Sequence, residues 1–464
     1  MAGNPFQCAL AGRARPTRLN ALALLVALGC GGNAVQAADI EHVIVISVDG
    51  LSGPLLGDLL RGETAKDLPA FRRLLAEGAG TLNARTDFTH TNTLPNHTTM
   101  LTGRPVLQPE GQPNTVHHGY TFNGSPSPTD TLHSLGNPNV SYVASAFDVA
   151  HDAGLSTALY ASKSKFIIYE QSYNASAGAP DATGDDNGRD KIDTYVYRFT
   201  GDPPTAEELN AAFLADMAKR RYAFVFLHYA DPDVAGHALG WGSPAWIDAV
   251  KRVDGYLAAV LGLVTKEPAL AGRTTLIVTS DHGGTGRDHA DPADPANYTI
   301  PFLAWGAGVT PGADLYELNA ATRRDPGQGR PDYNAAAAPI RDGDAANMAL
   351  SLLGRGPVPG STINAAQDLK LRAQVVGVRT LTECLSGPAE ASNPEICPPE
   401  KRLRADLQGD GDVDLFDVDR YLRWFQWEDG SPPTRAVAMP SPAVEQSPPP
   451  SPVAAPALPA LRSE

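Results

Sequence analysis

The chain has 464 residues and a formal net charge of −15, from 37 Lys and Arg residues against 52 Asp and Glu residues. Hydrophobic residues make up 42% of the chain and charged residues 19%, which excludes a disordered polyelectrolyte and leaves enough apolar material for a large core. The acidic balance argues against a nucleic-acid scaffold that follows phosphates with Lys and Arg. It does not exclude an enzyme that acts on phosphate, because bound metal ions can supply local positive charge.

Residues 1–37 have the pattern of a secretory signal peptide. They contain no Asp or Glu, three arginines precede the apolar run Ala21–Gly29, and the small residues Ala34 and Ala37 are placed for cleavage before Ala38. The run is too short to span a bilayer, and no other stretch is long and apolar enough to do so. We therefore predict an exported protein, periplasmic or extracellular. Lipidation at Cys30 is the alternative.

Short β-branched runs alternate with helical patterns along the next part of the chain. This alternation predicts an α/β fold with a mostly parallel central sheet and helices on both faces, in one domain over residues 38–378. The polar, Gly-rich stretch Asn174–Arg189 is expected to run over the surface. The expected strands are His42–Val48, Ser156–Ala161, Ala223–Tyr229 and Thr274–Thr279, and the expected helices are Leu68–Glu77, Ser141–Ala153, Thr205–Arg220, Ala245–Thr265 and Asp342–Leu353.

The composition changes beyond residue 378. Residues 379–428 hold Cys384 and Cys397, the two cysteines that remain after signal removal. A disulfide is the expected state of an even pair in an exported protein, and it could contribute on the order of 3 kcal/mol. A metal or redox pair is the weaker alternative, because C-x-x-C spacing and a nearby His are both missing. Residues 429–464 are dominated by Pro, Ala and Ser, which predicts a disordered tail.

An acidic loop over residues 406–417 has the spacing of an EF-hand calcium loop, with Gly411 at its sixth position. Asp417 at the last position, where EF-hands have Glu, resembles dockerin-type repeats. Dockerins normally carry two repeats and this chain has one, which makes a cohesin partner doubtful and favours a single calcium-stabilised appendage. A merely acidic surface loop is the alternative. The candidate ligands of one Ca²⁺ are Asp406, Gln408, Asp410, Asp412 and Asp417.

Asp and His residues recur directly after three of the predicted strands. Each one alone is more often a turn, a helix cap or a core group. Because ligands bind at the carboxyl ends of strands in open α/β sheets, we expect these residues to lie together. Six such residues and one hydroxyl could serve two zinc ions, and two metals about 4 Å apart can clamp both oxygens of a phosphoryl transfer. The six residues are Asp49, Asp233, His237, Asp281, His282 and His289.

Four short segments, taken in order, resemble the type I phosphodiesterase/nucleotide pyrophosphatase branch of the alkaline phosphatase superfamily. The resemblance covers about residues 40–370 and implies the fold of that superfamily. Each segment is weak alone, but the ordered set is specific. The segments are Val-Ile-Ser-Val-Asp-Gly at 45–50, Thr-Leu-Pro-Asn-His at 93–97, Pro-Asp-Val-Ala-Gly-His at 232–237 and Ser-Asp-His-Gly-Gly at 280–284.

The resemblance implies a role for each matching residue. Thr93 corresponds to the nucleophile, and Asn123 to the asparagine that holds a phosphoryl oxygen. His97 and His118 are interpreted as structural partners of the nucleophile loop rather than as ligands. Two zinc sites are implied, one formed by Asp49, Asp281 and His282 and the other by Asp233, His237 and His289.

The implied reaction is hydrolysis of a phosphodiester or nucleotide pyrophosphate bond through a phospho-threonyl intermediate. A threonine hydroxyl is a poor nucleophile at neutral pH, and coordination to a dication favours its alkoxide. Thr93 precedes an expected helix, Leu94–Leu101, whose N-terminus would also favour the phosphoryl anion. Threonine with asparagine favours a diester. Phosphomonoester or phosphonate hydrolysis is the alternative within the superfamily, and a sulfatase is unlike this motif because its formylglycine precursor and arginine are missing.

A hypothesis from another class is a catalytically dead scaffold that binds surfaces through its calcium loop. No expected ligand is missing, which favours the enzyme. A small phosphate-containing substrate is expected, and Lys163, Lys165 and Phe166 could either contact it or serve ordinary packing. Neither the natural substrate nor the oligomeric state follows from the sequence.

Overall fold

The computed structural model describes residues 40–182, 184–185, 187–198 and 206–372, together with positions 384, 385, 397 and 413. The expected signal peptide with Cys30 and the tail 429–464 lie outside the described residues, as do the calcium-ligand candidates. In segment 379–428, the structure has a disulfide between Cys384 and Cys397, the pairing that the sequence predicts, with Cα atoms 5.1 Å apart.

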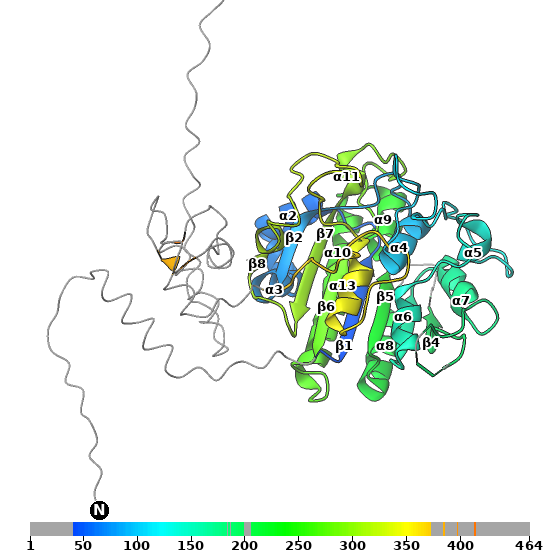
Figure 1. Cartoon of the computed structure of the whole chain (residues 1–464). Helices are drawn as coiled ribbons and strands as arrows, with labels where there is room; N and C mark the ends of the chain where they lie inside the picture. Colours follow the sequence, from blue (N-terminus) through cyan, green and yellow to red (C-terminus); the bar gives the residue numbers. More distant parts are fainter. Residues whose placement is uncertain are drawn as a thin grey trace, which may run out of the picture.

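One eight-stranded sheet forms the centre of the described chain (Figure 1), with its strands in the order β4-β3-β5-β1-β6-β7-β2-β8. Neighbouring strands from β4 to β6 are parallel. β7 is antiparallel to both β6 and β2, and β8 is parallel to β2. The strands are β1 (His42–Val48), β2 (Ala79–Arg85), β3 (Thr157–Ala161), β4 (Thr194–Tyr197), β5 (Phe224–Tyr229), β6 (Thr274–Thr279), β7 (Thr299–Gly306) and β8 (Ala313–Asp314).

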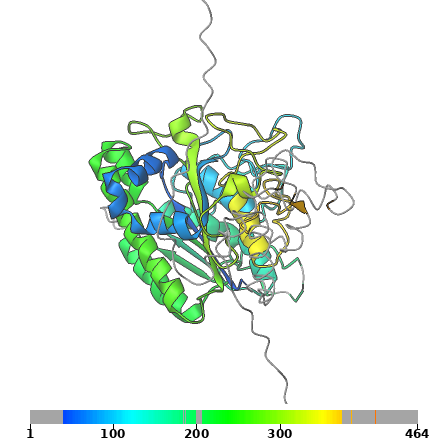
Figure 2. The ribbon, with the colours of Figure 1, turned by 90° about the vertical axis from the view of Figure 1, so that its left-hand side faces the viewer.

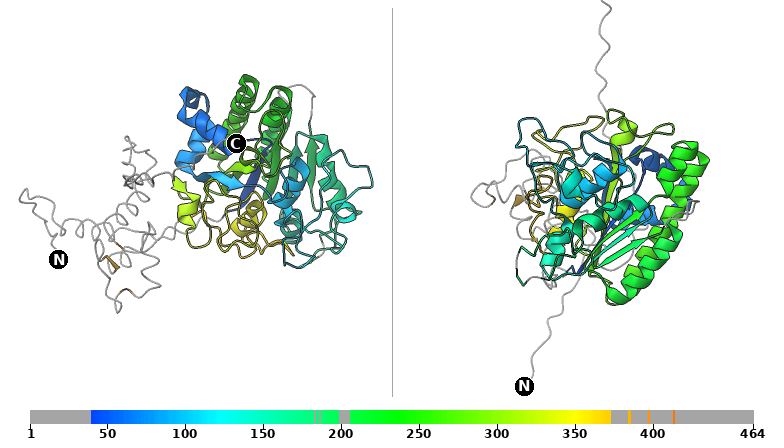
Figure 3. Two further views of the ribbon diagram at one scale, coloured as in Figure 1. Left: turned by 90° about the horizontal axis from the view of Figure 1, so that it is seen from above. Right: turned by 90° about the vertical axis from the view of Figure 1, so that its right-hand side faces the viewer.

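Helices cover both faces of the sheet, as predicted (Figures 2 and 3). α10 packs with α3, α8 and α9 on one face, and α13 packs with α4 and α6 on the other. The helices are α2 (Gly53–Arg61), η1 (Glu63–Asp67), α3 (Pro69–Glu77), α4 (Thr93–Thr102), α5 (Leu132–Leu135), α6 (Ala146–Asp152), η2 (Ser164–Phe166), α7 (Ile167–Tyr173), α8 (Glu207–Arg220), α9 (Asp231–Leu239), α10 (Pro244–Lys266), α11 (Pro295–Tyr298), α12 (Leu315–Leu318) and α13 (Asp344–Leu352). No helix within the described ranges is both long and apolar enough to cross a bilayer.

Strand β1 divides the apolar core into two halves. All seven of its residues are buried. Val43 and Val45 belong to the core on the side of α4 and α13, whereas Ile44 and Ile46 belong to the core on the side of α10. A strand buried on both faces needs apolar residues at successive positions, which explains why it reads as a continuous hydrophobic run.

The structure confirms the four predicted strands but adds others that the sequence pattern did not predict. β2 has the sequence AGTLNAR, which lacks a β-branched run, and its pairing with β7 shifts register between Thr81 and Ala84. β4 is a four-residue strand with partly buried side chains at the edge of the sheet. β2 is therefore held as a strand by its neighbours rather than by local propensity, whereas β4, with the sequence TYVY, consists of residues that favour strands.

The helix expected over Ser141–Ala153 is shorter than predicted. It begins at Ala146, because Ser145 caps it: the Ser145 N–H and hydroxyl both donate to Asp148 Oδ2, at 2.8 and 2.7 Å. This reciprocal cap satisfies backbone donors that would otherwise lack partners at the helix start. Residues before Ser145 therefore lie outside the helix.

Candidate metal centre

The carboxyl ends of β5, β1 and β6 lie side by side because β1 pairs with both of its neighbours. Asp49 directly follows β1, and Asp281 comes two residues after the end of β6. Asp233 lies in the first turn of α9, which begins two residues after β5. Chain connectivity therefore brings the three predicted carboxylates to one edge of the sheet, where ligands bind in open α/β folds.

The backbone around Asp49 allows these segments to approach closely. The Asp233 N–H donates to the Asp49 carbonyl oxygen at 3.1 Å, and the Gly50 N–H donates to Asp281 Oδ1 at 3.2 Å. Gly50 has a φ of +72°, and a Cβ there would lie 2.9 Å from the Asp233 Cα. Glycine is thus required at position 50 both by its backbone conformation and by its neighbour.

Asp49, Asp281 and His282 form one candidate metal-binding group, with donor atoms within 4.8 Å of one another. His282 Nε2 lies 3.4 Å from Asp49 Oδ1 and 3.2 Å from Asp281 Oδ2. The His282 Nδ1–H donates to the Gly283 carbonyl oxygen at 2.8 Å, so the lone pair is on Nε2. A backbone hydrogen bond that orients a histidine in this way is typical of metal ligands.

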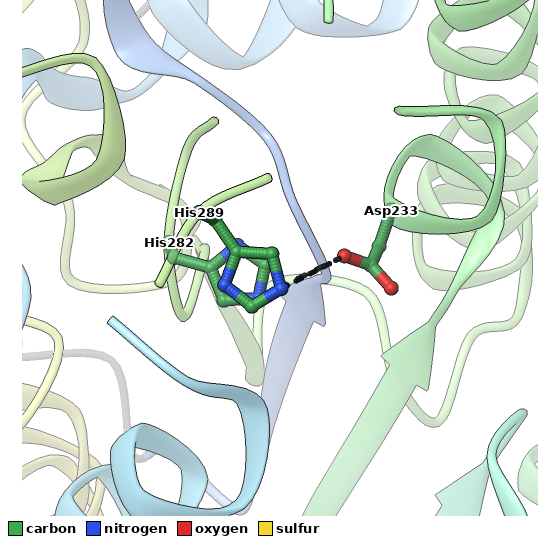
Figure 4. Close-up of side chains that lie close together, drawn as sticks. All are labelled: Asp233, His282 and His289. Atoms are coloured by element: carbon green, nitrogen blue, oxygen red, sulfur yellow. Dashed lines mark ion pairs between the residues drawn. The ribbon is translucent and has the colours of Figure 1, made fainter. Parts of the chain in front are cut away.

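Asp233, His282 and His289 form a second candidate group, so His282 belongs to both (Figure 4). The rings of His282 and His289 stack with centroids 3.6 Å apart, and His289 Nε2 lies 3.7 Å from Asp233 Oδ1. The His289 Nδ1–H donates to the Thr91 carbonyl oxygen at 2.6 Å, which leaves the lone pair on Nε2. Both histidines therefore direct an acceptor nitrogen toward carboxylate oxygens.

His237 completes the set predicted for this second group. Its Nε2 lies 3.3 Å from Asp233 Oδ1 and 3.1 Å from His289 Nε2, while its Nδ1–H donates to the Arg287 carbonyl oxygen at 3.0 Å. Two imidazole nitrogens that both carry lone pairs repel each other at 3.1 Å. A cation between them, either a proton or a metal ion, removes this repulsion.

Four buried donor atoms of the two groups have no hydrogen-bond partner. They are Asp49 Oδ1, Asp233 Oδ1, Asp281 Oδ2 and His282 Nε2. Leaving a buried acceptor unsatisfied costs about 1–3 kcal/mol, and more for a charged group. Carboxylate oxygens and an imidazole nitrogen that converge without partners fit divalent metal ions, and zinc in particular accepts this mixture of ligands.

The second oxygens of two of these carboxylates are occupied. Lys163 Nζ lies 2.6 Å from Asp49 Oδ2 and 2.6 Å from Asp233 Oδ2, and its side chain is 14% exposed. His228 Nε2 also lies 2.9 Å from Asp49 Oδ2. These contacts hold the outer oxygens and leave Oδ1 of each carboxylate to the metal-binding groups. His228 is not among the residues predicted from the sequence, although a His that interrupts the apolar run of β5 is a usable signal.

The electrostatic environment shifts the pKa values of these candidate ligands. Burial tends to raise the pKa of Asp49, but the Lys163 ammonium and the His228 contact hold that pKa well below its usual range. Burial and the charge of Asp49 raise the pKa of Asp281 well above its usual range. Burial lowers the pKa of His282 to about 3 and also lowers the pKa of His289. Neutral imidazoles are the form that binds metal ions.

The predicted nucleophile begins a helix next to these groups. Thr93 is buried and is the first residue of α4, which extends the predicted helix by one residue at each end. The His97 Nδ1–H donates to the Thr93 carbonyl oxygen at 2.7 Å, and His97 Nε2 contacts Ser47 Oγ at 2.8 Å. His97 Nδ1 also lies 3.5 Å from Asp281 Oδ2. His97 therefore links the helix start to β1 and the metal-binding groups, in the structural role expected of it.

Asn123 lies beside the predicted nucleophile although it is thirty positions away in the sequence. Its Oδ1 accepts a hydrogen bond from the Leu94 N–H at 2.9 Å. His118 donates through Nε2 to Thr99 Oγ1 at 3.1 Å and accepts the Tyr120 N–H at Nδ1, so both ring nitrogens have partners. The structure thus brings Asn123 to the site and keeps His118 as a structural group.

Two aromatic side chains pack against residues of the site. Phe166, which the sequence left open as a substrate contact, is fully buried against the rings of His97 and His228 and is a packing residue. Trp241 was not foreseen: its Nε1–H donates to the Gly50 carbonyl oxygen at 2.8 Å, and its ring lies 5.4 Å from that of His237. No sequence signal identifies Trp241, because its position depends on the close packing of two distant loops.

Fold and site together define a class of protein. A mostly parallel sheet with Asp and His clustered at its carboxyl ends, next to a helix that begins with threonine, is an α/β fold with a candidate metal centre. The family model of the type I phosphodiesterase / nucleotide pyrophosphatase family matches residues 43–342. The chain belongs to this family, as its motifs predict.

Parts of the chain are similar in sequence to curated proteins. GPI ethanolamine phosphate transferase 1 of Mus musculus is 31% identical over 145 residues, which cover 31% of this chain and 15% of that protein. A 2,3-bisphosphoglycerate-independent phosphoglycerate mutase of Acaryochloris marina is 28% identical over 202 residues, which cover 41% of this chain and 34% of the mutase. The chain therefore spans about a third or less of the length of these relatives.

Solved structures include two similar proteins. Murine ectonucleotide pyrophosphatase / phosphodiesterase 5 has 16% sequence identity and a TM-score of 0.48, over 71% of this chain and 99% of that chain. The human ectonucleotide pyrophosphatase / phosphodiesterase 5 has 15% identity and a TM-score of 0.47 over the same shares of the two chains.

Proposed function

We propose that the protein hydrolyses phosphodiester or nucleotide pyrophosphate bonds with Thr93 as nucleophile, at a centre that holds two zinc ions. The observation that carries this proposal is the convergence of the four unpartnered buried donor atoms beside the helix that Thr93 begins. One ion would be held by Asp49, Asp281 and His282 and the other by Asp233, His237 and His289. The bound ions would supply Lewis-acid stabilisation of phosphoryl oxygens and a lower pKa for the attacking hydroxyl.

The proposed reaction has two steps, and Thr93 takes part in both. The Thr93 hydroxyl loses its proton and its oxygen forms a bond to phosphorus while the bond from phosphorus to the leaving oxygen breaks, and the leaving group departs with a proton. Water then breaks the bond between phosphorus and the threonine oxygen, which restores the hydroxyl and releases the phosphate product. The helix N-terminus at Thr93 favours the negative charge of the phosphoryl group in both steps.

Asn123 would stabilise the charge that develops on the phosphoryl oxygens. Its Oδ1 already accepts the Leu94 N–H and a contact from Lys165 Nζ at 3.0 Å. The group that it can offer to a phosphoryl oxygen is therefore its amide N–H₂. A donor of this kind, held in place before the reaction, typically accounts for about 100- to 1,000-fold in rate.

The test is an assay of purified protein on bis-(4-nitrophenyl) phosphate, with and without a chelator. Thr93→Ala is expected to lower kcat by at least about 1,000-fold, as the loss of a nucleophile does in other hydrolases. Thr115→Ala is the matched control, because the Thr115 side chain is exposed and lies outside the site. Acid quenching with a labelled substrate should trap the phosphoryl group of the substrate, with its remaining ester, on the wild-type chain only. Full activity of Thr93→Ala would contradict the nucleophile assignment.

The two remaining expectations from the sequence are proposals of the same kind. Export through residues 1–37 predicts a mature protein that begins at Ala38, which mass spectrometry of the purified chain measures. Calcium binding by residues 406–417 predicts one Ca²⁺ per chain, with loss of this ion in Asp410→Asn. A mature chain that retains residue 1, or a chain that binds no calcium, would overturn the respective proposal.

A further inference from the structure

His289 lies in an irregular part of the chain. Segment 280–294 joins β6 to α11, and none of its residues, all of which the structure describes, belongs to a helix or a strand. The candidate ligands Asp49 and Asp233, in contrast, are placed by the end of a strand and by the first turn of a helix. The position of His289 must therefore be set by its contacts with other parts of the chain.

Thr91 and His289 form two hydrogen bonds that run in opposite directions. The Thr91 hydroxyl donates to the His289 carbonyl oxygen at 2.5 Å, and the His289 Nδ1–H donates to the Thr91 carbonyl oxygen at 2.6 Å. Both residues are buried, so water does not compete for these bonds. One bond fixes the backbone of His289 and the other fixes its ring. Partners of this kind around a metal-binding histidine typically affect metal affinity or activity by about 10- to 100-fold.

Thr91 is itself tied to the helix that carries the proposed nucleophile. Asn96, in the first turn of α4, donates through Nδ2 to the carbonyl oxygens of His90 and Asn92, at 3.0 and 3.1 Å. These two residues flank Thr91 in the sequence, and Thr93 begins the same helix two positions after Thr91. A single buried side chain of α4 therefore holds the backbone on both sides of Thr91.

We propose that Thr91 is a positioning residue, which holds His289 and with it the metal-binding group of Asp233 and His237 at a fixed place beside the start of α4. This inference rests on the proposed function. In-line attack needs reacting atoms about 3–3.5 Å apart, and a misplacement of about 1 Å can cost about 100-fold in rate. Thr91 acts through His289 and takes no direct part in the reaction. A purely structural hydroxyl would stabilise the fold without any effect on metal binding.

The first measurement is the zinc affinity of purified variants, by metal analysis and by competition with a chelator. Thr91→Val removes the hydroxyl donor with little change of shape, and it is expected to weaken binding of one of the two zinc ions about 10-fold. Thr91→Ser keeps the donor and should keep the wild-type affinity. Thr275→Val is the matched control and should leave both zinc affinities unchanged. The buried Thr275 hydroxyl donates to the Ala307 carbonyl oxygen at 2.6 Å, at the opposite end of β6 from Asp281.

Stability separates the positioning role from a purely structural one. Both valine variants leave a buried carbonyl oxygen without its donor, which costs about 1–3 kcal/mol. Urea denaturation should therefore give similar losses for Thr91→Val and Thr275→Val, and only the first should lose zinc affinity. If valine at position 91 prevents folding, Thr91→Ala removes the same donor and adds no atom. A loss of stability with unchanged zinc affinity in the Thr91 variant would overturn the inference.

The second measurement is kcat on bis-(4-nitrophenyl) phosphate with zinc in excess, so that both metal-binding groups are filled in every variant. The kcat of Thr91→Val should stay at least about 10-fold below that of the wild type, because the ion is bound but is not held in place. Thr91→Ser should regain most of the wild-type kcat. Full recovery of kcat in Thr91→Val would overturn the positioning role.

The two proposals fail in different ways. Full activity of Thr93→Ala overturns the proposed nucleophile, whereas a selective loss of one zinc ion in Thr91→Val would still support the role of Thr91 in holding His289. Unchanged zinc affinity and unchanged kcat in Thr91→Val overturn this inference and leave Thr93-dependent hydrolysis standing. A wild-type chain that binds no second zinc ion would overturn both the two-zinc centre and this inference.

Discussion

Two groups of Asp and His side chains in this fold have similar composition and use their polar atoms differently. The strand-end group consists of the six predicted ligands around Asp49 and Asp281. The loop group consists of His151, Asp152 and Asp181, which also lie close enough together to hold an ion. Each group is in contact with a lysine, so composition alone does not distinguish the two groups.

The lysine of the loop group occupies its centre. Lys191 is fully buried, donates to Asp152 Oδ1 at 2.9 Å and to the Gly188 carbonyl oxygen at 2.7 Å, and forms an ion pair with Asp181. Lys163 instead takes only the outer oxygens of the strand-end group, whose four inner atoms stay without partners, against one in the loop group, His151 Nδ1. Unpartnered atoms that converge, rather than a count of Asp and His, therefore distinguish a candidate metal site from an internal ion pair.

The largest expected effect is the loss of a strand-end ligand. Asp281→Asn should lower activity by more than about 100-fold, because removal of a residue that only supports a metal ligand typically costs 10- to 100-fold and Asp281 is itself a proposed ligand. Metal analysis should show less than the wild-type content of zinc. Asp152→Asn in the loop group is the matched control and should keep both activity and metal content. Equal loss of zinc in the two variants would contradict the distinction between the strand-end group as a metal site and the loop group as an internal ion pair.

The next effect concerns the cation of the loop group. Lys191→Met should lower the free energy of unfolding by roughly 3 kcal/mol, because Asp152 and Asp181 would keep their charges without the buried partner. Urea denaturation measures this change, and Lys219→Met should stay within about 0.5 kcal/mol of the wild type. Zinc content should not change in Lys191→Met. If added metal restored the stability of this variant, the loop group would also be a cation site.

A smaller effect tests the packing that supports the strand-end group. A Cβ at Gly284 would lie 2.2 Å from the Trp241 ring, so Gly284→Ala must displace the indole that packs beside His237. Overpacking of this kind typically costs 1–3 kcal/mol in stability. Gly255→Ala is the matched control, because Gly255 lies within α10 with open space around its Cβ and should gain about 0.5–1 kcal/mol. Thermal denaturation of the two variants should therefore give shifts of opposite sign.

The smallest expected effect concerns the pH dependence of stability at His118, whose ring nitrogens, unlike Nε2 of His282, both have hydrogen-bond partners. Both ring nitrogens of His118 have partners, and burial lowers its pKa from 6.5 to about 3. The unfolded chain therefore binds a proton at this residue near pH 6 that the folded chain does not, and stability falls as the pH drops below 6.5. Between pH 7 and 5.5 this contribution is about 1 kcal/mol. His118→Gln should show a correspondingly smaller loss in urea denaturation over that interval, and parallel curves would contradict the assignment.

Much of the fold could be predicted because its central strands carry a local signal. β1, β5 and β6 are apolar runs followed by Asp or His, and both features are read within a few residues. β2 could not be predicted, since its residues form a strand only when β7 provides the hydrogen-bonding edge, whereas β4 was missed although its sequence TYVY favours a strand. The antiparallel direction of β7 is likewise a property of its neighbours.

The ligand types and their order along the chain were determined by the sequence, because a residue that follows a parallel strand must lie at the carboxyl edge of the sheet. The tertiary structure alone decided which oxygen of each carboxylate is free, which lysine is neutralised, and where Trp241 lies. The contacts of Lys163 with Asp49 and Asp233 join residues that are far apart in the sequence. These contacts depend on the order of strands across the sheet. Whether a lysine neutralises a given carboxylate depends on the distance between the two groups in the folded chain. The net charge of −15, which follows from the sequence, does not identify these pairs.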